Sequence, residues 1–125
     1  MNVAIVDDSM LVRLQFKKFF EEVMSYNVIA LGSNGNEAVE LCEQHQPDLL
    51  VMDLAMPEKC GYEALIEIMK KSPDSKVLIC SATKNPKRIT SALNAGAKGY
   101  IKKPLLFTCE NWVESMQDAV KEAFE

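Results

Sequence analysis

Leu49-Leu50-Val51-Met52-Asp53 joins four consecutive apolar residues to an aspartate, and the fold follows from this stretch. A short, unbroken apolar run is typical of a strand in a parallel sheet, because helices cover such a strand on both faces. Burying a carboxylate at its end costs free energy unless the charge finds a partner. The stretch therefore predicts a buried strand over residues 49–52 that presents Asp53 at a functional edge of a sheet.

Four other short apolar runs have the same character. They are residues 3–6, 28–31, 77–80 and 100–101. Longer stretches with apolar residues at helical spacing follow every run. The first contains Val12, Phe16, Phe19, Phe20 and Val23, and the clearest extends from Trp112 to Phe124. Strict alternation of five strands with five helices predicts an α/β protein, in which helices cover both faces of a parallel sheet and the crossovers are right-handed.

Residues typical of helix starts and ends agree with this division of the chain into strands and helices. Asn34 followed by Glu37 is a capping pair for the second helix, and Asn85-Pro86 places a cap and a first-turn proline before the fourth. Gly96 stands where a helix C-terminus favours a glycine. We expect Thr108 to cap the last helix.

Length and composition narrow the class of protein. The chain has 125 residues, 48% of them hydrophobic, and a net charge of −4, so we expect one folded domain over residues 1–125. Lysines and arginines form no basic stripe, which argues against nucleic-acid binding. No apolar run approaches the ~20 residues of a membrane span, and the early acids exclude a secretory signal. The four cysteines lack the spacing of a zinc site, so we expect reduced thiols and a cytoplasmic protein.

The residues that follow the strands carry the chemistry. Asp7-Asp8 follows the first run, Asp53 the third, Ser81 the fourth and Lys102-Lys103 the fifth. Ligands of open parallel sheets bind beyond the carboxyl ends of the strands, so these groups should converge. Three adjacent carboxylates repel one another, and Mg²⁺, which prefers oxygen ligands, would relieve the repulsion. The three carboxylates, one Mg²⁺ and one lysine together carry a charge of about zero, so the site can receive a phosphoryl group, for which aspartate is a known acceptor.

These motifs resemble the receiver domains of two-component response regulators over essentially the whole chain. The matching segments are Val6-Asp7-Asp8-Ser9, Asp53-Leu54-Ala55-Met56-Pro57 with Gly61, Ser81-Ala82 and Lys103-Pro104. Each alone is a weak signal, but four in the right order at strand ends are specific. The resemblance implies a doubly wound, flavodoxin-like (βα)5 fold with strand order 2-1-3-4-5.

The resemblance also implies the chemical roles of the acidic residues. Asp53 would accept a phosphoryl group from a histidine kinase or a histidine phosphotransfer protein. Asp8 would bind Mg²⁺ directly, Asp7 directly or through water, and Asp53 and the backbone carbonyl of Ala55 would complete the protein ligands. The chain would promote only its own phosphorylation and dephosphorylation, so we expect a signalling switch and not an enzyme.

The remaining roles concern the switch. By resemblance, Lys103 contacts the phosphoryl oxygens through a Lys103-Pro104 peptide that is often cis, Ser81 hydrogen-bonds to the phosphoryl group, and Tyr100 follows that movement. The signal would then pass to a protein target through the fourth helix, fifth strand and fifth helix. Chemotaxis-type motor binding or a phosphorelay step fits a monomer that carries no DNA-binding segment.

Other interpretations of the same residues stay open. Asp7-Asp8 could cap a helix, and Tyr100 could be an ordinary packed aromatic residue. An aspartate-nucleophile phosphatase would need a second aspartate where Ala55 stands, and a flavin or nucleotide binder would need a glycine-rich loop after the first strand. The chain could also be a receiver taken from a larger regulator with an output domain. The apolar segment 105–109 is a candidate docking surface, and His45 is expected to be exposed.

Overall fold

The five predicted strands form one parallel sheet in the order β2-β1-β3-β4-β5 in the computed structural model, which describes all residues 1–125. The strands are β1 (Asn2–Val6), β2 (Asn27–Gly32), β3 (Leu49–Met52), β4 (Val77–Ser81) and β5 (Gly99–Lys102). All four strand pairs are parallel. The predicted fold class and strand order are confirmed, with β3 at the centre of the sheet.

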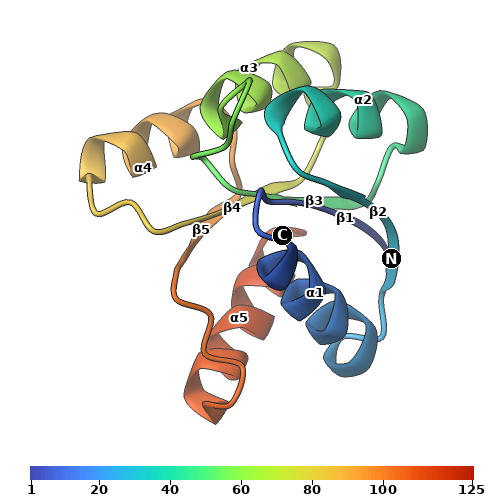
Figure 1. Cartoon of the computed structure of the whole chain (residues 1–125), viewed down its shortest axis with the longest axis vertical. Helices are drawn as coiled ribbons and strands as arrows, with labels where there is room; N and C mark the ends of the chain where they lie inside the picture. The colour runs from blue at the N-terminus through green and yellow to red at the C-terminus, as the bar shows by residue number, and fades with distance from the viewer.

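Helices cover both faces of this sheet. Figure 1 shows α2 (Gly35–His45), α3 (Gly61–Lys71) and α4 (Pro86–Asn94) on one face, and α1 (Met10–Lys18) and α5 (Glu110–Glu122) on the other. Successive side chains of a strand point to opposite faces, so every strand contributes to both layers of the core. The doubly wound architecture follows from strands that are apolar on both faces.

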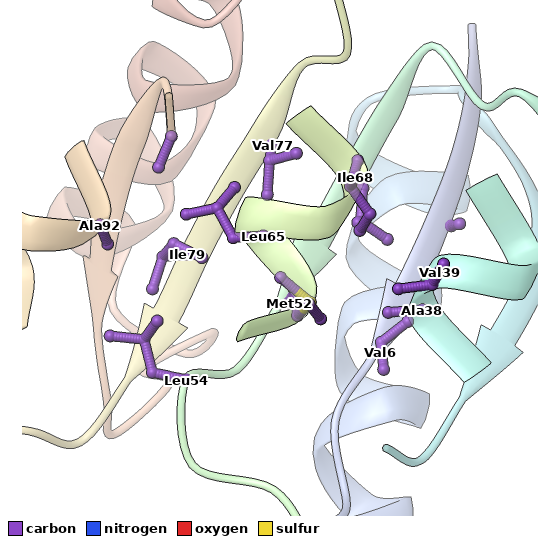
Figure 2. Packing of buried hydrophobic residues seen from close by; sticks show 14 residues of the cluster. Val6, Ala38, Val39, Met52, Leu54, Leu65, Ile68, Val77, Ile79 and Ala92 are labelled. Atoms are coloured by element: carbon purple, nitrogen blue, oxygen red, sulfur yellow. The ribbon is translucent and has the colours of Figure 1, made fainter. Parts of the chain in front are cut away.

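Two separate hydrophobic clusters fill these layers. Figure 2 shows the first, in which Leu65 and Ile68 of α3 lie against side chains of the sheet such as Val77. The second, on the side of α1 and α5, contains Phe16 and Val120. Burial of this much apolar surface is the main favourable contribution to folding.

The helix ends agree with the capping signals, with one exception. Asn34 Oδ1 accepts a hydrogen bond of 2.9 Å from the Glu37 N–H, and Asn85 Oδ1 accepts one of 3.0 Å from the Lys87 N–H. Gly96 has a φ of +120°, which glycine adopts readily. The prediction that Thr108 caps the last helix is wrong. Cys109 occupies the N-cap position and makes no side-chain cap hydrogen bond.

The first helix ends differently from the prediction. A π-helical turn, η1 (Phe19–Val23), follows α1, and the Met24 N–H donates to the carbonyl of Phe19, five residues earlier. Phe19 and Phe20 are both buried beside Phe16, as apolar residues at the helical spacing i, i+3 and i+4 are, and the wider π-helical turn changes the direction of the residues that follow. Val23, expected on the apolar stripe, is therefore 45% exposed.

Several smaller predictions can be compared with the structure. All four cysteines are free thiols: Cys80 is buried, Cys42 and Cys60 are half-buried and Cys109 is exposed. His45 is exposed at the end of α2, as expected. No helix combines the length and the apolar character that crossing a bilayer requires.

Candidate phosphoacceptor site

Three carboxylates meet at the carboxyl edge of the sheet, beyond the adjacent strands β1 and β3. The hydrogen-bond ladder continues past both strands: the Asp7 N–H donates to Gly32 O at 3.0 Å and the Asp53 N–H to Val6 O at 3.1 Å. This backbone pairing holds the two aspartates side by side. One carboxylate oxygen from each of Asp7, Asp8 and Asp53 lies within 4.8 Å of the others. The predicted convergence of the acids is observed.

Lys103 joins two of these acids. Its Nζ lies 2.7 Å from Asp7 Oδ2 and 3.0 Å from Asp53 Oδ2, while its backbone N–H donates to Ser81 O at 3.0 Å. The following Lys103-Pro104 peptide is cis. Lys102, the last residue of β5, is exposed. The geometry therefore places Lys103 in the site and leaves Lys102 in solvent.

Burial determines the electrostatics of the cluster. Asp7 is 1% exposed and Asp53 is 5% exposed. Burial raises the pKa of the Asp7 carboxyl above its usual range, and the hydrogen bonds from Lys103 and the Ser9 N–H only partly offset this effect. For Lys103, burial lowers the pKa, but the hydrogen bonds to Asp7 and Asp53 outweigh it and the pKa is raised. Asp7 is thus costly to ionise, while Lys103 stays charged.

Two further residues support the acids, and the sequence did not suggest their contacts. Arg13 Nη1 donates to the backbone carbonyl of Asp7 at 2.7 Å, which ties α1 to the loop after β1. Gly61, noted only as part of a motif, packs so closely that a Cβ on it would lie 1.9 Å from the carbonyl oxygen of Asp53. A cation on the first helix facing the acidic loop was the available signal for Arg13. No local pattern signals the Gly61 contact.

Ser81 and Tyr100 lie beside one another near this edge. Ser81 is buried, and its Oγ accepts a hydrogen bond of 3.3 Å from the Thr83 N–H. The Tyr100 hydroxyl lies 2.9 Å from Ser81 O and 3.0 Å from Thr83 O. Burial raises the pKa of this phenol, so it remains a hydrogen-bond donor. The hydroxyl of Tyr100 is therefore connected to the backbone that carries Ser81.

The acidic cluster suits a small divalent cation. Its donors are carboxylate oxygens, which Mg²⁺ prefers. With all three acids ionised, their charge of −3 and the +1 of Lys103 leave a net charge of −2, which a divalent cation balances. Ala55 is exposed, and its N–H donates to Asp53 Oδ1 at 3.3 Å. Asp7, Asp8 and Asp53 are thus compatible with Mg²⁺ binding, and the Ala55 carbonyl stays a predicted ligand.

Fold and site together define a class: a doubly wound α/β domain with an acidic, lysine-bridged cluster at the carboxyl edge of its sheet. The response regulator receiver domain family matches residues 3–109, and the chain belongs to this family. Members of the family act as phosphorylation-activated switches and bind Mg²⁺ at an acidic pocket.

Individual relatives and a solved structure agree with this assignment. The chemotaxis protein CheY of Listeria monocytogenes is 36% identical over 121 residues, which cover 97% of this chain and 99% of that protein. CheY of Thermotoga maritima is 40% identical over 103 residues, 82% of this chain and 85% of its own. A chain of the CheX-CheY-BeF3-Mg complex from Borrelia burgdorferi superposes with a TM-score of 0.91 at 29% identity, covering 100% of this chain and 90% of that one.

Proposed function

We propose that this protein is a signalling switch that accepts a phosphoryl group on Asp53 from a phosphohistidine. The observation that carries the proposal is the bridge from Lys103 to Asp7 and Asp53 within a cluster of three carboxylates. A purely structural ion pair would not require the third acid. A phosphoryl acceptor does, because the cation that assists the transfer must also be held.

The residues divide the work of the transfer. Asp53 Oδ attacks phosphorus while the bond from phosphorus to the donor imidazole nitrogen breaks, and the imidazole leaves with the bonding electron pair. Asp7, Asp8, Asp53 and the Ala55 carbonyl would hold Mg²⁺, which supplies positive charge for the phosphoryl oxygens. Lys103 donates a hydrogen bond to one of these oxygens once the phosphoryl group replaces its contact with Asp53.

The switch uses the connection between Ser81 and Tyr100. Hydrogen bonding of Ser81 Oγ to the phosphoryl group draws the backbone after β4 toward Asp53. Because the Tyr100 hydroxyl lies against the carbonyls of Ser81 and Thr83, this ring moves with that backbone. The surface of α4, β5 and α5 then favours its signalling conformation, as expected when a local charge shifts a two-state equilibrium.

We infer the partners from the same proposal. The donor is a histidine kinase or a histidine phosphotransfer protein, and the target is a protein that binds the α4-β5-α5 surface. Residues 1–125 act as one cytoplasmic receiver unit, monomeric before phosphorylation, that contacts neither nucleic acid nor membrane. A further output domain in a longer chain is the alternative. A phosphatase has less support, because the methyl group of Ala55 can neither donate nor accept a proton.

Beryllium fluoride with Mg²⁺ tests the proposal, since this complex imitates an acyl phosphate. We expect it to shift the amide NMR resonances of Ser81, Thr83 and Tyr100 in the wild-type protein, and Asp53→Asn should abolish these shifts. Asp74→Asn, which changes an exposed turn aspartate, is the matched control and should respond normally. An unchanged response in Asp53→Asn would place the acceptor elsewhere.

A further inference from the structure

A second concave site lies next to the acidic cluster. It is a pocket of about 770 Å³ between the loop after β3 and the first turns of α3 and α4, which lie on the same face of the sheet (Figure 1). We call it the α4 pocket. Its volume is within the ~300–1,000 Å³ of pockets that bind small ligands. It shares Asp8 with the three-carboxylate cluster, and its lining also includes Ala55, whose carbonyl is a predicted Mg²⁺ ligand.

The lining of the α4 pocket is divided by polarity. Leu54, Met56 and Pro57 supply an apolar wall from the loop after β3. Lys87 and Arg88 stand on the wall formed by α4, and Ser91 lies one turn further along this helix. Asp8 stands among the lining residues as a fixed negative charge. A ligand that fits must therefore carry its own charge toward α4 and its apolar part toward the loop.

The two cations are unusual in their helix. They occupy the first turn of α4, which contains no acidic residue, although the positive end of the helix dipole disfavours cations there. Neither forms an ion pair, whereas Lys59 and Lys71 on the neighbouring surface both bind glutamates. Residues that oppose local stability without compensation tend to mark functional sites. Lys87 and Arg88, both exposed, thus provide positive charge that no ion pair neutralises, in a chain whose net charge is −4.

We propose that the α4 pocket binds a small organic anion with an apolar body. The carboxylate, sulfonate or phosphate of the ligand lies against Lys87 and Arg88, where the first-turn N–H groups of α4 add to the attraction. Its apolar body covers Leu54, Met56 and Pro57 and removes their surface from water. The repulsion from Asp8 fixes the orientation. Binding requires neither Mg²⁺ nor a modified Asp53.

A pair of probes that differ in one charge tests this proposal. 1-Anilinonaphthalene-8-sulfonate has an aromatic body with a sulfonate, and N-phenyl-1-naphthylamine has the same body without it. We expect the sulfonate to bind the folded protein at one site and to shift the amide resonances of residues 54–62 and 87–91. Lys87→Gln combined with Arg88→Gln should weaken its binding at least tenfold and change that of the neutral amine less than twofold. Lys98→Gln, an exposed lysine beyond α4, is the matched control.

A steric variant gives an independent measurement. Ser91→Phe should fill the pocket and abolish binding of both probes, with a folded state verified by the dispersion of the NMR spectrum. Equal binding of the sulfonate to wild type and the double glutamine variant would overturn the proposal, as would binding that never saturates. Binding of an acidic Glu-Leu helical peptide without binding of the sulfonate would assign the pocket to a protein partner and overturn it too. Because all titrations omit Mg²⁺ and phosphodonor, their outcome is independent of phosphorylation at Asp53.

Discussion

Replacing Gly61 by alanine should displace Asp53, the proposed phosphoryl acceptor. The Gly61 N–H donates to Leu54 O at 2.8 Å, and this contact seats the start of α3 directly on the backbone of the Asp53 loop. A Cβ at this position would lie 1.9 Å from Asp53 O and 2.7 Å from Leu54 Cα. Both are backbone atoms, so no side-chain rotation can relieve the overlap.

The size of the effect follows from these distances. Real Cβ contacts are not shorter than 3.0 Å, so the helix or the loop must move by about 1 Å. Overpacking of this kind costs about 3 kcal/mol, a large part of the roughly 5–15 kcal/mol that stabilises a typical domain. A 1 Å displacement of a reacting group can slow chemistry by about 100-fold. We therefore expect Gly61→Ala to lose both stability and phosphorylation rate.

Urea unfolding and the rate of phosphorylation by a small phosphodonor with Mg²⁺ measure the two effects. The matched control is Gly99→Ala in β5, where a new Cβ would meet only Leu78 Cδ2, at 3.1 Å. That flexible side-chain end can move, so the control should lose less than about 1 kcal/mol and keep its rate. If Gly61→Ala were as stable and as rapidly phosphorylated as the control, the proposed seating of Asp53 by α3 would be wrong.

Three other substitutions or measurements follow from the site. Lys103→Ala should still be phosphorylated but leave the α4-β5-α5 resonances unshifted, and a fully switched variant would show that Lys103 does not transmit the signal. Because the folded pKa of Asp7 is raised, its protonation stabilises the fold at low pH and this stability is lost as pH rises through the folded pKa. At pH 7 in EDTA, urea unfolding should thus give Asp7→Asn a larger free energy of unfolding than the wild type. Addition of 10 mM Mg²⁺ should stabilise only the wild type. A smaller free energy of unfolding for the variant in EDTA would refute this reasoning. Burial raises the pKa of Cys80 to about 12, so at pH 8 its thiolate population is about 1,000-fold below that of an ordinary thiol. Iodoacetamide followed by mass spectrometry should therefore label exposed Cys109 long before Cys80, and the reverse order would contradict the assigned burial.

Local patterns were sufficient for the strands and for most helix ends. The run before Asp53 is apolar because β3 is covered on both faces, and the capping by Asn34 depends on residues three positions apart. The same reasoning failed near Val23 and Thr108. An α-helical stripe cannot anticipate a π-helical turn, which leaves Phe19 and Phe20 in the core but turns Val23 toward solvent.

The choice between two adjacent lysines shows the limit of local reasoning at the site. Composition and spacing left Lys102 and Lys103 equivalent, and only resemblance favoured the second. In the structure Lys102 is exposed and Lys103 points to the acids, since successive residues of an extended chain point in opposite directions. The direction depends on where β5 begins and ends, which the sheet determines.

By itself, the sequence determined which residues form strands, that they alternate with helices, and that Asp7, Asp8 and Asp53 stand at strand ends. These properties are encoded in periodicity and in the cost of burying polar groups, both of which act over a few residues. Only the tertiary structure decided that Lys103 reaches Asp7, 96 residues away, that Gly61 supports Asp53, and that two cations of α4 face an apolar wall. Contacts between distant segments depend on how whole helices and strands pack together, because their positions minimise the free energy of the entire core and not of any one segment.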